Sequence, residues 1–354
     1  MNHKIVPLLA IVFLLLGVTG CQKTVNIEQL EKELVGVWWD EYEYSGTTET
    51  GIPFSKVLLA IKADADHTGC IYLALFDNER SEHLEVYGGP KDAGFKWQLL
   101  EDGSVKLSDP ASGESTVLTR ADGGSNYGED MTNVSNTNMT YTGGSVTVTN
   151  GSYSSTLTKA DADTQAEIGK TAAALQHKLA KEATEEDLGK VIAADGRIYD
   201  TTADATNAGA RPLAVIARKH QFGVNAYQYT AIAISDESSR LNWNDAKNAC
   251  KNKTTKFDGV ECGWMFPTKA DWEDLFKANG GKVNSGKRLN ALITKAGGND
   301  LRTYNNGGKY WTADSEDDYW KIAKSFDNSY NVFEHSTLYS STEYVRAFFY
   351  FIPL

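Results

Sequence analysis

The chain has 354 residues, of which 41% are hydrophobic and 23% are charged, and its formal net charge at pH 7 is −12. This composition is that of a globular protein, and the length favours two domains, because single hydrophobic cores usually stop growing at about 250–300 residues. The acidic balance and the lack of a Lys/Arg cluster in the sequence argue against nucleic acid as a partner, since phosphate binding requires a cationic surface.

The first twenty residues have the pattern of a targeting segment. Lys4 supplies a positive charge, and the apolar stretch 7–16 is shorter than the ~20 residues that a membrane-spanning helix needs. Val18-Thr19-Gly20-Cys21 follows and resembles a bacterial lipobox. The resemblance implies a lipoprotein signal peptide (1–20) and acyl chains such as palmitate on Cys21; an ordinary secretory signal is the alternative. The next residue is Gln22 and not the Asp that resembles an inner-membrane retention signal. We therefore expect the protein at the outer membrane or the cell surface.

The four cysteines leave one pair that an oxidising envelope could bridge. Cys21 carries lipid in this interpretation, and Cys70 lies in a different region from Cys250 and Cys262. Because sequence spacing does not fix disulfide geometry, a Cys250–Cys262 bridge and two free thiols both remain open.

Residues 21–33 are predicted to form a tether that ends in a short amphipathic helix, because Ile27, Leu30 and Leu34 follow helical spacing. Short runs of strand type come next, at 34–39, 57–61, 69–76, 94–99 and 104–107, with a polar hairpin at 140–151. No helical period separates these runs. Residues 34–160 are therefore predicted to form an all-β antiparallel barrel or sandwich. The opening run Leu34-Val35-Gly36-Val37-Trp38-Trp39 is similar to the first strand of lipocalin-like envelope domains, which implies a barrel.

A helical linker is predicted over residues 161–187. Ile168, Ala172, Leu175 and Leu179 share one face of a helix over residues 163–181, and Lys and Glu occupy the other face. Because this apolar stripe is narrow, we expect a spacer that packs lightly on one domain.

Strand and helix signals alternate in the second predicted domain, residues 188–354. An Asp195-Gly196 turn indicates a hairpin over 188–199, and apolar strands are expected at 212–217 and 229–235. Asn242 can cap a helix that turns Trp243, Ala246 and Cys250 inward. The remaining elements are a helix over 289–295 and strands at 309–312, 320–326, 330–333 and 344–351.

The stretch from Gly263 to Phe276 is predicted to be the corner of this domain. Thr268 is a natural helix N-cap with Asp271 at the third helical position, and Trp272, Leu275 and Phe276 would form the buried face.

The order of these motifs resembles the bacterial C-type-lectin-like domains of surface lipoproteins, also called major-paralogous domains. This fold is shared with formylglycine-generating enzymes and implies an α+β domain that binds a ligand. One departure from the family pattern is Met265-Phe266, where a basic residue followed by Leu is usual. The resemblance is carried by Asn242-Trp243-Asn244-Asp245-Ala246, Gly263-Trp264-x-x-Pro267-Thr268-x-x-Asp271-Trp272, Tyr310-Trp311-Thr312 and Tyr344-Val345-Arg346.

The sequence gives no support to a catalytic or metal-dependent role. Trp243-Asn244-Asp245 matches the calcium motif of animal C-type lectins in its letters, but it opens an early helix and lacks the accompanying acidic-Pro-Asn loop. Formylglycine-generating enzymes depend on late thiols, and no cysteine follows Cys262. The six histidines lack zinc spacing, and no nucleophile elbow, P-loop or dinucleotide motif occurs. We therefore expect no enzyme activity, no cofactor and no metal.

The tail from Tyr304 to Tyr344 is rich in Tyr, Asn and Ser, the composition of adaptable binding loops. Tyr310, Trp311, Trp320 and Phe326 are expected to be core positions of strands. The chain is thus predicted to be a lipid-anchored cell-envelope protein that binds a surface protein or glycan. The alternatives are an assembly subunit of a surface fimbria or polysaccharide-uptake complex, and a degenerate enzyme. The candidate ligand-binding residues are Tyr304, Asn305, Asn306, Tyr319, Asn328, Tyr330, Asn331, Phe333, His335 and Tyr339.

Overall fold

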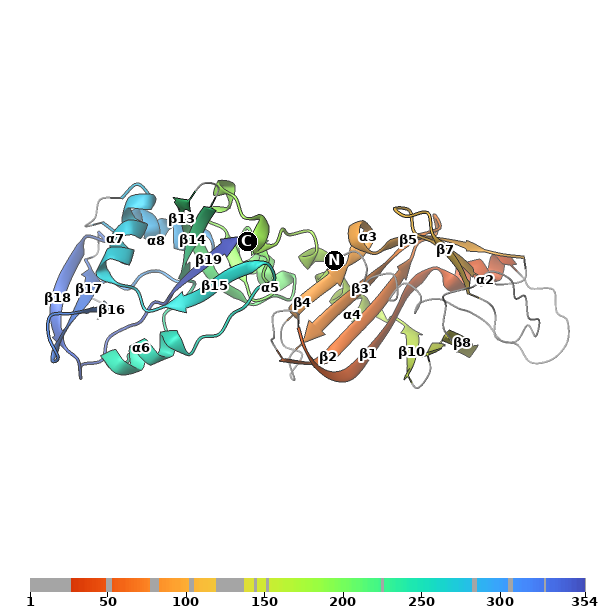
Figure 1. Cartoon of the computed structure of the whole chain (residues 1–354), viewed down its shortest axis with the longest axis horizontal. Helices are drawn as coiled ribbons and strands as arrows, with labels where there is room; N and C mark the ends of the chain where they lie inside the picture. Colours follow the sequence, from red (N-terminus) through yellow and green to blue (C-terminus); the bar gives the residue numbers. More distant parts are fainter. Residues whose placement is uncertain are drawn as a thin grey trace. The chain divides into compact units, whose positions relative to one another are not determined.

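The computed structural model describes residues 27–48, 53–76, 83–101, 105–118, 137–142, 145–150, 153–223, 226–281, 285–304, 308–327 and 329–353 (Figure 1). The predicted signal peptide and Cys21 lie outside these residues. The described part consists mostly of antiparallel β-sheet with few helices, and the chain divides into two compact units, made mainly of residues up to Leu175 and from Gln176 onward.

The first unit is built on one ten-stranded sheet. Its strands run in the order β7-β6-β5-β3-β2-β1-β10-β9-β8, with β4 paired to β3, and the pairs with a defined register are antiparallel. The bounds are β1 Gly36–Thr47, β2 Pro53–Ala63, β3 Thr68–Phe76, β4 His83–Gly88, β5 Gly94–Leu99, β6 Val105–Ser108, β7 Ser115–Leu118, β8 Thr137–Thr142, β9 Ser145–Asn150 and β10 Tyr153–Lys159.

Apolar runs and three helices stabilise this sheet. Every residue of β2 from Val57 to Ile61 is buried, as expected where both faces of a strand are covered. The predicted first helix is confirmed as α2 (Ile27–Leu34), and the Trp38 indole donates a hydrogen bond of 3.0 Å to the Leu34 carbonyl. The short helix α3 (Gly89–Asp92) and helix α4 (Ala162–Ala174) both contact β3.

The predicted linker helix is wrong beyond Ala174. Helix α4 belongs to the first unit, and short 3₁₀ turns η1 (Ala180–Glu182) and η2 (Glu185–Asp187) follow in the second. The Arg197 guanidinium donates to the His177 carbonyl at 2.6 Å, and the Ile198 N–H donates to the Lys178 carbonyl at 3.0 Å. After Ala174 these hydrogen bonds take the place of the bonds within a helix. A carbonyl group that accepts from a neighbouring hairpin does not point along a helix axis, so the helix does not continue.

The second unit contains a six-stranded and a three-stranded sheet. The larger sheet has the order β12-β11-β13-β14-β19-β15, with β11 Val191–Ala193, β12 Ile198–Tyr199, β13 Pro212–Gly223, β14 Ala226–Ala233, β15 Val260–Met265 and β19 Phe348–Pro353. The smaller sheet has the order β16-β17-β18, with β16 Lys309–Ser315, β17 Trp320–Phe326 and β18 Val332–Leu338.

Helices α5 (Thr202–Asn207), α6 (Trp243–Lys251), α7 (Lys269–Ala278) and α8 (Lys287–Lys295) complete this unit. The predicted caps of α6 and α7 are confirmed: Asn242 accepts from Asp245 N–H, and Thr268 and Asp271 form a reciprocal capping box. The predicted last strand begins later than expected, at Phe348, because the Tyr344 N–H donates to Lys309 in the small sheet instead.

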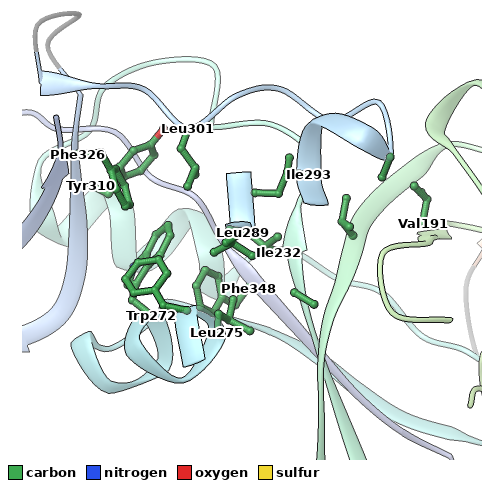
Figure 2. Packing of buried hydrophobic residues seen from close by; sticks show 14 residues of the cluster. Val191, Ile232, Trp272, Leu275, Leu289, Ile293, Leu301, Tyr310, Phe326 and Phe348 are labelled. Carbon is green, nitrogen blue, oxygen red and sulfur yellow. The ribbon is translucent and has the colours of Figure 1, made fainter. Parts of the chain in front are cut away.

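The main core of the second unit packs α7 and α8 against residues of both sheets (Figure 2). Trp272, Leu275 and Phe276 are fully buried, as predicted, and pack with Ile232 of the large sheet. The corner from Gly263 to Phe276 is therefore scaffold, and it fixes the position of the small sheet.

Candidate functional site

Helix α7 packs against the three-stranded sheet chiefly through the aromatic ring of Trp272. The Trp272 ring lies 5.7 Å from the ring of Tyr310 on β16, 5.9 Å from that of Phe326 on β17 and 4.9 Å from that of Phe348 on β19. Because these three rings belong to three strands of two sheets, Trp272 links the small sheet to the large one.

An ion-pair network adds a second connection between α7 and the small sheet. Lys324 of β17 is buried, and its ammonium group lies 3.3 Å from Glu273 of α7 and 3.2 Å from Glu334 of β18. Glu334 also pairs with Lys269 at 2.8 Å. Burial opposes ionisation of Glu334, but the hydrogen bond from Lys269 and the charge of Lys324 outweigh it and lower the pKa of this carboxyl group.

The large apolar side chains that remain exposed in the described part of the chain all lie between residues 304 and 339. They are on or beside the small sheet, and none lies on the six-stranded sheet or in the first unit as far as the structure describes them. A concentration of this kind on a soluble domain is typical of an interaction surface. The exposed side chains are Tyr304 (53%), Tyr319 (65%), Trp320 (42%), Phe333 (49%), Leu338 (44%) and Tyr339 (40%).

Four of these side chains gather where β17 begins and β18 ends, and we call this group the ribbon end: Tyr319, Trp320, Leu338 and Tyr339. Trp320 and Leu338 are directly opposite each other in the strand register, so their side chains share one face. The Tyr339 N–H donates to the Tyr319 carbonyl at 2.9 Å, and the two tyrosine rings are 6.4 Å apart. The ribbon end thus has apolar groups on both faces.

A second group forms a flat surface beside β18, and we call it the platform: Tyr304, Phe333 and His335. Phe333 and His335 are two residues apart on β18 and share a face, and the Tyr304 ring stacks on His335 with a centroid distance of 5.8 Å and an interplanar angle of 8°. Ser325 Oγ lies 2.7 Å from His335 Nε2. Burial, followed by the charge of Lys309, lowers the pKa of His335, which favours the uncharged ring.

The predicted candidates are only partly brought together. Tyr304, Phe333 and His335 meet in the platform, and Tyr319 and Tyr339 meet in the ribbon end. Tyr330 instead packs against the core and is half-buried, and the Asn331 side chain donates to Asp327 at 2.7 Å, which stabilises the turn before β18. Asn305, Asn306 and Asn328 lie outside the described residues.

The prediction that Trp320 belongs to the core is wrong, whereas Tyr310, Trp311 and Phe326 are buried as predicted. Trp320 is the first residue of β17, and its cross-strand partner is the exposed Leu338, so none of the described elements buries it. Leu338 was missed as a candidate. The signal available in the sequence was its position next to Tyr339 at the end of a strand-like run.

Cys250 and Cys262 are free thiols in the structure, so the disulfide that the sequence left open is not formed. Cys250 is fully buried in a cluster with Ala246 and Trp311, and burial raises the pKa of its thiol to about 12. Cys262 packs against a different cluster, where its thiol lies 3.4 Å from the Thr255 carbonyl.

Two further observations concern the described residues as a whole. No helix among them is long and apolar enough to cross a bilayer. Their His, Cys, Asp and Glu side chains form no group of three or more that could hold a metal ion.

Comparison with known proteins supplies no family for the chain. No protein-family model matches the sequence, and a search of curated proteins found no significant similarity.

Proposed function

We propose that the chain is a lipid-anchored binding protein of the bacterial cell envelope, attached through Cys21 at the outer membrane or cell surface. Its C-terminal unit is a non-catalytic, C-type-lectin-like domain that recognises a surface protein or glycan, and its N-terminal unit is a lipocalin-like β-domain. The observation that carries the proposal is that, among the side chains that the structure describes, the exposed large apolar ones are confined to the small sheet and its flanks.

The chemistry of this surface supports binding rather than catalysis. Tyrosine and tryptophan offer large, rigid contact areas with few rotatable bonds, and their rings stack equally well on sugar faces and on protein side chains. The small sheet that carries both groups is fixed by Trp272 and by the Lys324 network, so little ordering of its strands is needed on binding. Such preorganisation favours recognition of an external ligand.

The binding surface is tested with variants of the mature chain carrying Cys21→Ser. Arrays of envelope glycans and of bacterial and host surface proteins are screened with wild type, with Tyr319→Ala/Tyr339→Ala and with Tyr304→Ala/Phe333→Ala. Tyr227→Ala on β14 is the control, because it removes a tyrosine from the large sheet. We expect a ligand whose affinity falls at least tenfold in one of the double variants and is unchanged in the control. Equal binding by all variants would exclude the small sheet as the site.

The anchor is tested separately. Metabolic labelling with palmitate should mark the wild-type protein and not Cys21→Ala, and the variant should leave the membrane fraction. Palmitate incorporation that survives Cys21→Ala would contradict the lipoprotein assignment.

One observation favours an assembly subunit as the second candidate. Strand β18 ends the small sheet and pairs along its length only with β17 in the described part of the chain, apart from an isolated bridge between Asn331 and Ser285. An unpaired strand edge can accept a strand from another chain. Assembly predicts concentration-dependent oligomers of the mature chain in sedimentation velocity, whereas the binding role predicts a constant sedimentation coefficient.

A further inference from the structure

The first unit contains a surface cavity of about 590 Å³ next to helix α2, over β5, β6 and the start of β3. This volume lies within the range of about 300–1,000 Å³ that is usual for small-molecule sites. The lining is mainly polar, and it includes Glu31, His67, Lys96, Gln98, Lys106 and Ser108. The aromatic surface of the second unit takes no part in it.

The floor of the cavity is a grid of four polar side chains. Lys96 of β5 is opposite Ser108 of β6, and Gln98 is opposite Lys106, so the strand register places all four on one face of the sheet. Lys96 and Lys106 are diagonal neighbours, a relation that separates positions by about 7–8 Å and is within reach of long side chains. Two ammonium groups can therefore approach one ligand from opposite sides.

The side chains of these two lysines have no acidic partner in the part of the chain that the structure describes, where no side-chain hydrogen bond or ion pair involves either of them. The two acidic groups that line the cavity make their hydrogen bonds to other residues of its lining. Glu31 is hydrogen-bonded to His67 Nε2. Asp66 accepts hydrogen bonds from Thr68 Oγ at 2.6 Å and from Thr68 N–H at 3.0 Å, and these bonds lower its pKa. The two ammonium groups of the floor are thus not paired directly with a carboxylate, while Glu31 and Asp66 hold their negative charges at other positions of the lining.

The wall of the cavity is fixed by backbone and ring contacts. His67 has a positive φ of 65° in the turn between β2 and β3, and its ring meets Trp97 edge-on with centroids 4.7 Å apart. The Trp97 indole donates to the Thr68 carbonyl at 3.2 Å, and the Trp97 N–H donates to the His67 carbonyl at 2.9 Å. A wall held in this way needs little rearrangement when a ligand enters.

We infer that this cavity binds a small anion, whose carboxylate or phosphate group is held between Lys96 and Lys106 and accepts hydrogen bonds from Gln98 and Ser108. The volume leaves room for a body of monosaccharide size attached to the acidic group. Neutral sugars lack the group that the two lysines recognise. The site is independent of the aromatic surface and adds a second, chemically different ligand to the protein.

The inference is tested by isothermal titration calorimetry of the mature chain, carrying Cys21→Ser, with three probes: glucuronate, glucose 6-phosphate and glucose. We expect at least one of the two anions to bind, with an affinity that falls as salt rises, and glucose not to bind. Lys96→Gln/Lys106→Gln should weaken anion binding at least tenfold. The control Lys32→Gln/Lys91→Gln removes two exposed lysines of the same unit that do not line the cavity, and it should bind as the wild type does.

Each remaining outcome decides against the site. Failure of both anions to bind at millimolar concentration, equal binding of glucose, or equal weakening in the control would overturn the inference. Since Lys96 is exposed and Lys106 only half-buried, the double variant should keep its fold, and an unchanged circular dichroism spectrum and melting temperature verify this. Anion binding by Tyr319→Ala/Tyr339→Ala should equal that of wild type, which separates this inference from the proposed role of the small sheet.

Discussion

Replacement of Trp272 by Phe should cost little stability, although this is among the largest fully buried side chains of the described structure. The reason is the indole N–H. Trp272 Nε1 is buried and finds no hydrogen-bond acceptor among the described residues. Phenylalanine keeps most of the ring contacts with Tyr310, Phe326 and Phe348 and removes the unpaired donor.

The two opposing effects are of similar size. The smaller ring leaves a cavity of about 40 Å³, which at about 24 cal/mol per Å³ costs about 1 kcal/mol, and the lost apolar contact adds about 1 kcal/mol. Removal of a buried, unpaired N–H raises the free energy of unfolding by about 1–3 kcal/mol. Trp272→Phe should therefore change the free energy of unfolding by no more than about 1 kcal/mol. Trp272→Ala also empties the ring site and should cost about 3–5 kcal/mol.

Trp311 provides the matched control. It is equally buried, but its indole donates a hydrogen bond of 2.7 Å to the Leu241 carbonyl, so Trp311→Phe leaves a buried acceptor unpaired. We expect Trp311→Phe to be about 1–3 kcal/mol less stable than Trp272→Phe. The assay is urea-induced unfolding of the mature chain followed by far-UV circular dichroism, with the transition of the C-terminal unit fitted separately. Equal losses in the two Phe variants would refute the reasoning.

Three further predictions concern the supports of the small sheet. The lowered pKa of Glu334 means that its ionised form stabilises the fold above the unfolded pKa of about 4.3, and that this contribution disappears as pH falls through the lower folded pKa. In thermal melts Glu334→Gln should be less stable than wild type at pH 7, and the difference should shrink as the pH is lowered through the acid range. Thr268→Ala removes the cap of α7 and should lower the free energy of unfolding by about 0.5–2 kcal/mol in urea, with Thr268→Ser restoring most of it. Maleimide should label Cys262 before Cys250 under native conditions, because Cys250 is fully buried. Simultaneous labelling would contradict this difference in burial, and a lack of labelling at both residues unless a reductant is added would contradict the free state of the two thiols.

Local signals in the sequence were enough to predict the scaffold of the C-terminal unit. The caps at Asn242 and Thr268 and the apolar spacing of Trp272, Leu275 and Phe276 depend on neighbours within one turn of helix, so the sequence contains all the required information. The Asp195-Gly196 hairpin is of the same kind, with Gly196 at a φ of 74° that suits glycine.

Features that depend on distant partners were not predictable. Strand β10 is rich in Ser and Thr and is held by pairing with β1, more than one hundred residues earlier in the chain. A lysine at position 324 predicts a solvent-exposed side chain. The side chain is nevertheless buried, because Glu273 and Glu334 pair with its charge. Beyond α4, the His177 carbonyl accepts a hydrogen bond from Arg197, twenty residues further along the chain, and helical spacing does not reveal such a contact.

The candidate sites show the same division. Composition alone located the aromatic tail. Only the register of β17 with β18 shows that the platform and the ribbon end are separate groups and that Trp320 lies opposite the exposed Leu338. The grid of Lys96 and Lys106 is equally hidden in the sequence, because the two residues become neighbours only through the pairing of β5 with β6.

The most direct test of the central claim is hydroxyl-radical footprinting of the mature chain with and without the ligand identified in the screen. Aromatic side chains react readily, so each exposed ring reports its own coverage. We expect oxidation of Tyr304, Phe333, Tyr319, Trp320 and Tyr339 to fall on binding, in the platform, the ribbon end or both, while oxidation of Tyr227 on the large sheet is unchanged. Protection confined to other parts of the chain, with these five rings as reactive as in the free protein, would contradict the account.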